Sequence, residues 1–232
     1  MKNFSIVIPA FNEEDNIPLL LDQIFNSLKE TQYNYEVIIV DDNSSDNTYS
    51  AFLQNFNIKN KKIIRNNKNY GQSKSILFGI QKASYENIVT LDADLQNDPL
   101  DIIKLAKYYF NSNEYKMVAG IRTKRRDSYL KILSSKIANK VRAFILKDNC
   151  PDTGCSLKIF KKKIFLDFKF FDGIHRFLPA LFIGNNFKIK YIDVNHRHRI
   201  NGISKYGTIS RMIWGIRDIF KVKMMINKKN KK

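Results

Sequence analysis

The sequence predicts an α/β protein in which helices cover both faces of a mostly parallel sheet. Apolar segments of strand length alternate with amphipathic segments of helix length along the first half of the chain. The strand segments lack a regular apolar–polar alternation, which is typical of parallel strands buried on both faces. The chain has 232 residues, 44% of them hydrophobic. It is therefore long enough to form one large domain around a sizeable core.

Local patterns define each expected element. Helices are expected where apolar side chains recur at spacings of three and four residues. One helix should begin at Asp98-Pro99, because aspartate favours the N-cap and proline the first helical position. The expected strands span residues 4–9, 36–40, 62–65, 88–91, 116–120 and 155–160, with an extended segment at 187–199. The expected helices span residues 12–29, 46–56, 72–83, 99–110, 128–147, 175–184 and 208–226.

Distinctive residues follow three of the expected strands at the point where each ends. Residues 9–13 end the first strand, Asp41 and Asp42 end the second, and Asp92-Ala93-Asp94 ends the strand at 88–91. Ligands of open parallel sheets bind beyond the carboxyl ends of the strands. We therefore expect all three segments to lie on one edge of the sheet.

Asp92 and Asp94 need a partner at the end of a buried strand. Without one, their charges would repel each other and their burial would be costly. A divalent cation removes that cost, and carboxylate oxygens suit Mg²⁺ or Mn²⁺. Because Mg²⁺ usually keeps water and binds substrate phosphates, the pattern indicates a cation that holds a diphosphate. The alternative is a strand that ends in a solvated acidic turn.

The formal net charge is +18, and the excess is concentrated in two segments. Residues 122–147 hold nine basic residues and one acid, and residues 188–232 hold thirteen basic residues and two acids. The partner classes consistent with this pattern are nucleic acid, an anionic membrane surface and phosphorylated substrates.

Absent motifs disfavour several classes of protein. The chain has no Gly-x-Gly-x-x-Gly after its first strand and no Gly-x-x-x-x-Gly-Lys, which disfavours dinucleotide-dependent dehydrogenases and P-loop enzymes. Cys150 and Cys155 do not suggest a secreted disulfide framework, and no second close ligand pair suggests zinc. We expect reduced thiols in a cytoplasmic protein. No run of residues is long and apolar enough to span a membrane.

Four motifs together resemble family 2 glycosyltransferases, and more narrowly the polyprenyl-phosphate (dolichyl-phosphate) mannosyltransferase branch. Each motif is weak alone, whereas four in the right order and spacing are specific. A late basic segment at residues 199–206 also resembles that branch, so the similarity covers almost the whole chain. The four motifs are Ser5-Ile6-Val7-Ile8-Pro9-Ala10-Phe11-Asn12-Glu13, Val40-Asp41-Asp42-Asn43-Ser44, Asn69-Tyr70-Gly71 and Asp92-Ala93-Asp94-Leu95-Gln96.

The resemblance implies a GT-A fold and an inverting, metal-dependent transfer of a hexose such as mannose from a GDP- or UDP-linked sugar to polyprenyl phosphate. Asp94 and Gln96 would bind Mg²⁺ or Mn²⁺. The implied substrate-binding residues are Pro9, Ala10, Phe11, Glu13, Val40 and Asp42 around the nucleoside, Asp92 and Ala93 along the ribose and diphosphate, and Arg122, Arg199 and Lys205 near the phosphates or sugar.

The nature of the acceptor decides whether a general base is needed. A phosphate acceptor is already ionised near neutral pH, whereas a sugar hydroxyl must lose a proton. Asp152 is the candidate that would orient the acceptor or sugar, and a turn-capping role for it is equally weighted. Two acceptors therefore stay open: polyprenyl phosphate, and a hydroxyl of a lipid or cell-surface glycan.

The C-terminal region departs from many relatives because it has no transmembrane pair. We expect a transferase domain at residues 1–206, a basic amphipathic helix at 207–226 and a disordered tail at 227–232. The helices at 128–147 and 208–226 would lie on the cytoplasmic face of an anionic membrane with their apolar faces in the lipid. The alternative is that these faces pack on the core.

A nucleic-acid-binding module is the competing reading from a different functional class. It would use the high positive charge. However, the basic residues line amphipathic helices, and the acidic residues at the strand ends would repel a phosphate backbone. We therefore expect no nucleic acid among the partners.

Overall fold

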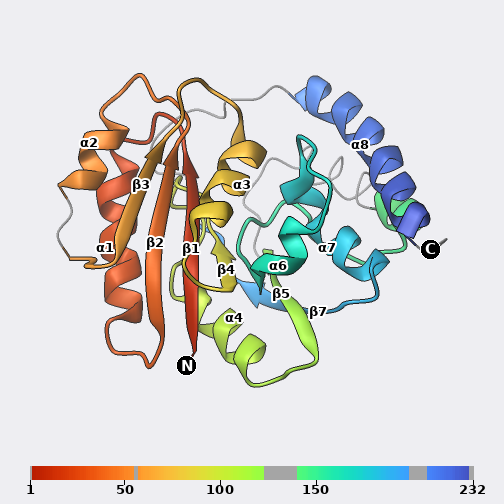
Figure 1. Ribbon diagram of the computed structural model, residues 1–232, viewed down its shortest axis with the longest axis horizontal. Coiled ribbons are helices and arrows are strands. Elements are labelled where there is room, and N and C mark those ends of the chain that lie inside the picture. The colour runs from red at the N-terminus through yellow and green to blue at the C-terminus, as the bar shows by residue number, and fades with distance from the viewer. Residues whose placement is uncertain (1, 55–56, 123–139, 199–207, 230–232) are drawn as a thin grey trace.

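The computed structural model describes residues 2–54, 57–122, 140–198 and 208–229, and only the backbone of 208–216 and 228–229. Seven described strands form one sheet in the order β3-β2-β1-β4-β6-β5-β7 (Figure 1). Only β6 among them runs antiparallel to its neighbours, so the predicted mostly parallel sheet is confirmed. The strands are β1 (Asn3–Ala10), β2 (Asn34–Asp41), β3 (Lys61–Arg65), β4 (Asn87–Thr90), β5 (Tyr115–Arg122), β6 (Lys158–Lys161) and β7 (Lys188–Val194).

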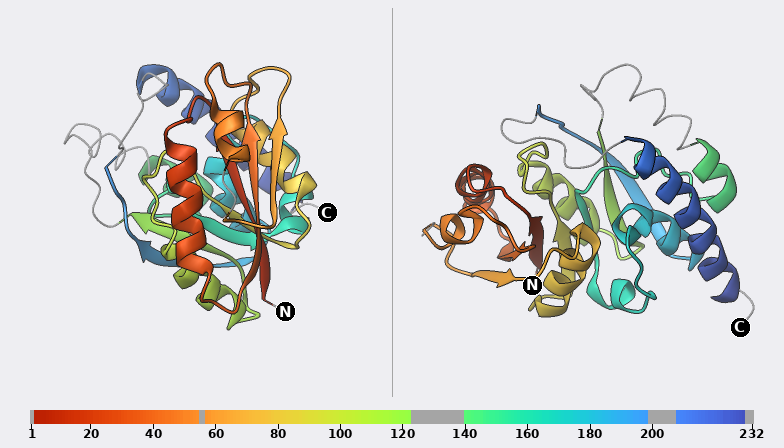
Figure 2. Two further views of the ribbon diagram at one scale, coloured as in Figure 1. Left: turned by 90° about the vertical axis from the view of Figure 1, so that its left-hand side faces the viewer. Right: turned by 90° about the horizontal axis from the view of Figure 1, so that it is seen from above.

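Helices cover both faces of the sheet, as the sequence predicts (Figures 1 and 2). The helices α1, α2 and α4 contribute to one buried apolar cluster, and α3, α6, α7 and α8 contribute to the other. The helices are α1 (Asn16–Leu28), α2 (Thr48–Leu53), α3 (Gln72–Lys82), α4 (Asp101–Phe110), α6 (Lys162–Leu166), α7 (Ile174–Gly184) and α8 (Thr208–Lys229), with a further helical segment at 140–146.

Successive side chains of the central strands enter opposite clusters. Ile6 and Ile8 of β1 lie in the cluster under α1 and α4, whereas Val7 lies in the cluster under α3 and α7. Both sides of these strands are therefore buried in apolar surroundings. This explains why the strand segments are almost continuously apolar rather than alternating.

Several predicted boundaries differ from the structure. The helix expected from residue 12 begins at Asn16, because residues 11–15 form a turn against the chain that follows β2. The helix expected from residue 99 begins at Asp101. Asp98 instead accepts a hydrogen bond from the Leu100 N–H (3.1 Å), which closes a turn before the helix. The strand expected at 155–160 occupies Lys158–Lys161 and is antiparallel.

The C-terminal helix is present, but it extends further than predicted. It runs from Thr208 to Lys229, so residues 227–229 are helical rather than part of a disordered tail. Of the expected helix at 128–147, residues 140–146 are helical, and the part up to residue 139 lies outside the described residues. None of the helices in the described part of the chain combines the length and apolar content needed to cross a bilayer.

Gly79 sets how closely α3 approaches the sheet. A β-carbon at this position would clash with Cγ1 of Val7 and would lie 3.0 Å from Cγ2 of Val40. An exposed glycine-to-alanine change inside a helix gains up to about 1 kcal/mol of stability. We expect Gly79→Ala to lose about 1–3 kcal/mol instead, because the packed core resists the added methyl group.

Urea unfolding measures this difference. Gln81→Ala, an exposed change on the same helix, should alter the free energy of unfolding by less than about 0.5 kcal/mol. A stabilised Gly79→Ala variant would contradict the close approach of α3.

Candidate active site

The carboxyl ends of β1, β2 and β4 lie at one edge of the sheet. Strand β1 pairs in parallel with both β2 and β4, with Ala10 opposite Asp41 and Val7 opposite Thr90. The segments that follow these three strands therefore meet at this edge, as the sequence predicts.

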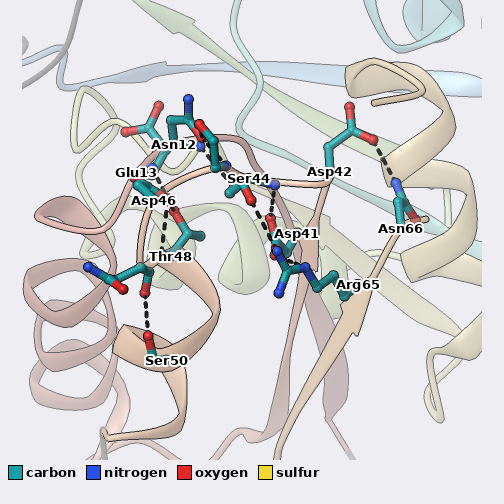
Figure 3. A network of polar contacts seen from close by, with 12 residues as sticks. Asn12, Glu13, Asp41, Asp42, Ser44, Asp46, Thr48, Ser50, Arg65 and Asn66 are labelled. Carbon is teal, nitrogen blue, oxygen red and sulfur yellow. Dashed lines mark hydrogen bonds and ion pairs between the residues drawn. The ribbon is translucent and has the colours of Figure 1, made fainter. Parts of the chain in front are cut away.

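The segments after β1 and β2 are joined by hydrogen bonds from backbone to side chain (Figure 3). Asn12 has a positive φ of 53°, its N–H donates to Ser44 Oγ (2.9 Å), and its own Oδ1 accepts from the Ser45 N–H (2.9 Å). The N–H of Glu13 donates to Thr48 Oγ1 (2.8 Å). These bonds fix the turn that carries Phe11 and Glu13, two of the predicted nucleoside contacts.

Asp41 and Asp42 are both buried, yet they make different contacts. Asp41 accepts a hydrogen bond from the Ser44 N–H (2.9 Å) and lies 3.3 Å from Nε of Arg65. Asp42 points away from Asp41 and toward the loop before α3 (Figure 3).

Three donors hold the Asp42 carboxylate. They are the Tyr70 N–H (2.9 Å), the Gly71 N–H (2.7 Å) and Nδ2 of Asn66 (2.7 Å). Two of these donors belong to the Asn69-Tyr70-Gly71 motif, so the structure brings two of the sequence motifs together. A contact between Asp42 and a base or ribose stays a prediction.

The Asp92 carboxylate lies next to the start of α3 and to Asp94. Gln72, the first residue of α3, donates from Nε2 to Oδ1 of Asp92 at 2.8 Å. Burial of the carboxyl group and the charge of Asp94 raise the pKa of Asp92 to about 6, against the opposing effects of a hydrogen bond from the Ser156 side chain and of the charges of Lys158 and Arg122. The ionised form is thus disfavoured, as expected for two carboxylates that share one site.

The residues present fit a divalent cation. Asp94 is buried, and Gln96 follows it with its N–H donated to Oδ1 of Asp94 at 3.2 Å. A cation beside Asp92 and Asp94 would stabilise both charges, and the amide of Gln96 offers another oxygen ligand. Among the described residues, no group of three or more His, Cys, Asp or Glu could hold a metal by itself. Magnesium sites that use one or two carboxylates are completed by water and substrate phosphates.

Arg122 and Asp152 form a two-point ion pair beside these carboxylates. Nε and Nη2 of Arg122 lie 2.7 and 2.8 Å from the two carboxylate oxygens, and the Arg122 N–H also donates to Oδ2 (3.2 Å). Asp152 in addition accepts from the Gly154 N–H (3.1 Å), so its side chain also caps the turn there. The Asp152 carboxylate is thus held by the Arg122 guanidinium and by two backbone N–H groups.

Sequence reasoning missed Lys158, which is 2% exposed on β6. Its Nζ donates to the carbonyl oxygen of Cys155, and its charge acts to lower the pKa of Asp92. The sequence does contain a sign that Lys158 is buried, because this lysine lies inside the apolar run Leu157-Lys158-Ile159-Phe160. A buried lysine next to acidic residues provides positive charge within the site.

His175, at the start of α7, was also missed. The Gly173 N–H donates to Ser73 Oγ (2.8 Å), which leaves the Ser73 hydroxyl proton for Nδ1 of His175 (2.6 Å). Burial and the charges of Arg176 and Lys158 lower the pKa of His175 to about 3, so the ring is neutral near neutral pH. Its proton then resides on Nε2. The alternation expected at residues 187–199 instead places His196 and His198 on one face of an extended segment. In the structure, Nδ1 of His196 lies 3.3 Å from the carbonyl oxygen of Gln96.

The chain after β7 is fastened to the segment that carries Gln96. The Arg197 N–H donates to the Gln96 carbonyl (2.9 Å), and the Arg197 guanidinium lies 2.7 Å from Asp98 and 2.7 Å from Gln23. The predicted phosphate contacts Arg199 and Lys205 come directly after this anchored segment, but they lie outside the described residues.

A family model described as glycosyl transferase family 2 matches residues 5–168. The matched range includes the strand ends, the paired carboxylates and Lys158. The chain belongs to this family.

The curated relatives act on polyprenyl phosphates, according to their names. The undecaprenyl-phosphate 4-deoxy-4-formamido-L-arabinose transferase of Pectobacterium carotovorum is 35% identical over 210 residues, which is 89% of this chain and 63% of the relative. The dodecaprenyl-phosphate galacturonate synthase of Rhizobium johnstonii is 33% identical over 223 residues, 94% of this chain and 65% of the relative. This family 2 chain thus spans less than two-thirds of the length of these relatives.

Solved structures support the GT-A fold. Glucosyl-3-phosphoglycerate synthase from Mycobacterium tuberculosis, in complex with Mn²⁺, UDP and glucosyl-3-phosphoglycerate, superposes with a TM-score of 0.71 at 14% identity. The match covers 97% of this chain and 79% of that one. A complex of the same enzyme with Mg²⁺ and UDP gives 0.71 at 15% identity, over 94% and 79%. At these identities the likeness shows the fold alone.

Asp42 should stabilise this family 2 domain through the donors that it accepts. In Asp42→Asn the new amide group cannot accept all three hydrogen bonds and leaves buried donors unpaired. We expect a loss of about 1–3 kcal/mol in the free energy of unfolding, measured in urea. Asp167→Asn, which changes an exposed carboxylate, should cost less than about 0.5 kcal/mol. Equal stability of the two variants would contradict the role of Asp42 in holding the loop.

Proposed function

We propose that this chain transfers a sugar from a nucleotide sugar to polyprenyl phosphate, with inversion at the sugar carbon. The observation that carries the proposal is the placement of Asp92 and Asp94 at the shared strand edge, beside the Arg122–Asp152 pair and the buried Lys158. The names of the curated relatives support the polyprenyl phosphate acceptor.

The donor would lie along the sheet edge with its diphosphate at Asp92 and Asp94. The turn at 9–13, together with Val40 and Asp42, would surround the nucleoside. Mg²⁺ or Mn²⁺ held by Asp94 and Gln96 would stabilise the negative charge that develops on the leaving diphosphate. Arg122 would contact the diphosphate or sugar, as would Arg199 and Lys205. UDP is the nucleotide that the solved GT-A complexes favour, and GDP is the alternative.

The geometry around Asp152 favours an acceptor that needs no general base. Asp152 is already engaged by Arg122 and by the Gly154 N–H. A phosphate acceptor attacks as an anion, so the enzyme must lower the repulsion between two anions rather than remove a proton. Lys158 supplies positive charge for this purpose, as does Arg122, whose guanidinium also pairs with Asp152.

The reaction would take place at the surface of a membrane, because the lipid chain of a polyprenyl phosphate anchors it in the bilayer. We propose the cytoplasmic face. The sugar is left open. Mannose follows from the sequence motifs alone, whereas the relatives are named for a formamido-arabinose and for galacturonate.

A donor screen tests the reaction and its metal. UDP- and GDP-linked sugars are incubated with polyprenyl phosphate, with and without Mn²⁺, and the glycolipid product is quantified. We expect transfer with Mn²⁺ and its loss in EDTA. Asp94→Ala should lower the rate by about a hundredfold or more, because the leaving diphosphate loses its counter-charge. Asp167→Ala, an exposed change, should match the wild type. Full activity of Asp94→Ala would refute the metal assignment.

The variant Asp152→Asn separates the two acceptor classes. With a phosphate acceptor, the change disturbs the position of Arg122, and we expect a rate loss of about tenfold with no change in the pH profile. With a hydroxyl acceptor, loss of the base would lower the rate by about a hundredfold or more and remove the acid limb of the pH profile. The second outcome would move the proposal to a glycan or lipid hydroxyl.

A further inference from the structure

Four large apolar side chains are exposed on two helices near the C-terminal end of the fold. On the helix at 140–146, Phe144 is 86% exposed and Val141 48%. On α8, Phe220 is 57% exposed and Met224 60%. The two helices lie side by side, at the end of the molecule remote from α1 and α2 (Figures 1 and 2). We call these four residues the apolar patch.

The patch is separate from the face that each helix buries. Leu146 of the first helix and Ile219, Val222 and Ile226 of α8 all enter the buried cluster on the α3 and α7 side of the sheet. Ile219 therefore packs on the core, whereas we expect from the sequence that the apolar face of this helix enters the lipid. The two side chains Phe220 and Met224 are four residues apart and lie on the opposite side of α8.

Each helix takes part in an ion pair. Nε of Arg142 lies 3.1 Å from Asp148, in the chain directly after the first helix, and both side chains are buried. Nη2 of Arg176, in the first turn of α7, lies 2.9 Å from Asp218 of α8. Both helices also pack on the core through their buried faces, and no described part of the chain covers the exposed apolar side chains.

Three exposed lysines lie close to the patch residues in sequence. Lys140 and Lys147 are exposed at the two ends of the first helical segment, and Lys221 is exposed next to Phe220. The acid nearest to Phe220 in sequence is Asp218, which is largely buried and paired with Arg176. Exposed aromatic and long apolar side chains with lysines nearby match the boundary between anionic head groups and acyl chains.

We propose that the apolar patch and its lysines bind an anionic membrane surface, with Phe144, Phe220 and Met224 inserted below the head groups. Binding of the patch to a membrane does not depend on the proposed function. Only the role of that binding, to bring the enzyme to a lipid acceptor, rests on it. The Arg176–Asp218 pair joins α8 to α7, where His175 contacts Ser73, next to the Gln72 that holds Asp92. Binding through the patch would therefore hold the active site at a fixed height above a lipid acceptor.

Vesicle co-sedimentation tests this surface. The vesicles contain phosphatidylcholine alone or an equimolar mixture with phosphatidylglycerol. The patch variant is Phe144→Ser/Phe220→Ser/Met224→Ser, and the matched control is Leu19→Ser/Leu53→Ser, which changes side chains of 46% and 49% exposure on α1 and α2. We expect the wild type and the control to bind the mixed vesicles in a salt-sensitive way. The patch variant should bind at least about tenfold more weakly, because buried apolar area and charge both set the affinity.

Wild-type binding equal to that of the patch variant, or no wild-type binding to the mixed vesicles, would overturn the proposal. The urea midpoints of both variants report whether the fold is kept, and the single change Phe144→Ser replaces the triple variant if that one unfolds. Transfer to a water-soluble, short-chain prenyl phosphate distinguishes this surface from the proposed function. If the wild type does not transfer sugar to this soluble acceptor, the proposed acceptor is refuted but membrane binding by the patch is not. If the patch variant still transfers sugar to it, the variant is defective only in membrane binding.

Discussion

The parallel pairing of β1 with β2 and β4 is the constraint on which the rest of this structure depends. It brings the ends of three strands, and with them Asp41, Asp42 and Asp92, to one edge of the sheet. A sheet edge that gathers carboxylates is electrostatically unfavourable unless each charge finds a partner. Most of the contacts described at this edge are hydrogen-bond donors and basic side chains that stabilise these carboxylates.

The carboxylates are stabilised to different extents. Those with several donors hold the local structure, whereas those with fewer are suited to bind a cation. Asp42 is held by two backbone N–H groups and an amide, and Asp152 is held by Arg122. Asp92 accepts from the Gln72 amide and from the Ser156 side chain, yet its pKa remains raised to about 6 by burial and by Asp94. An added positive charge beside Asp92 and Asp94 would therefore stabilise the protein.

The first turn of α7 connects this edge to the C-terminal helix. Ser73 of α3 accepts from Gly173 and contacts His175, while Arg176 pairs with Asp218 of α8. Burial and the positive charges of Arg176 and Lys158 keep His175 neutral near neutral pH, so this contact carries no charge of its own. A helix that the sequence presents as a separate appendage is in this way packed on the same domain as the carboxylates.

The sequence by itself determined the fold class and the strand edge, because buried parallel strands need continuous apolar runs and the motifs end those runs. It also identified the family through Asp92-Ala93-Asp94 and the motifs around it. Only the tertiary structure decided that Asp42 holds the Tyr70–Gly71 loop and that Arg122 engages Asp152, because these contacts join residues about thirty positions apart. The same holds for Lys158 and for the core-facing side of α8. Helical spacing shows that a face is apolar, but which partner covers that face depends on the neighbours that the folded chain supplies.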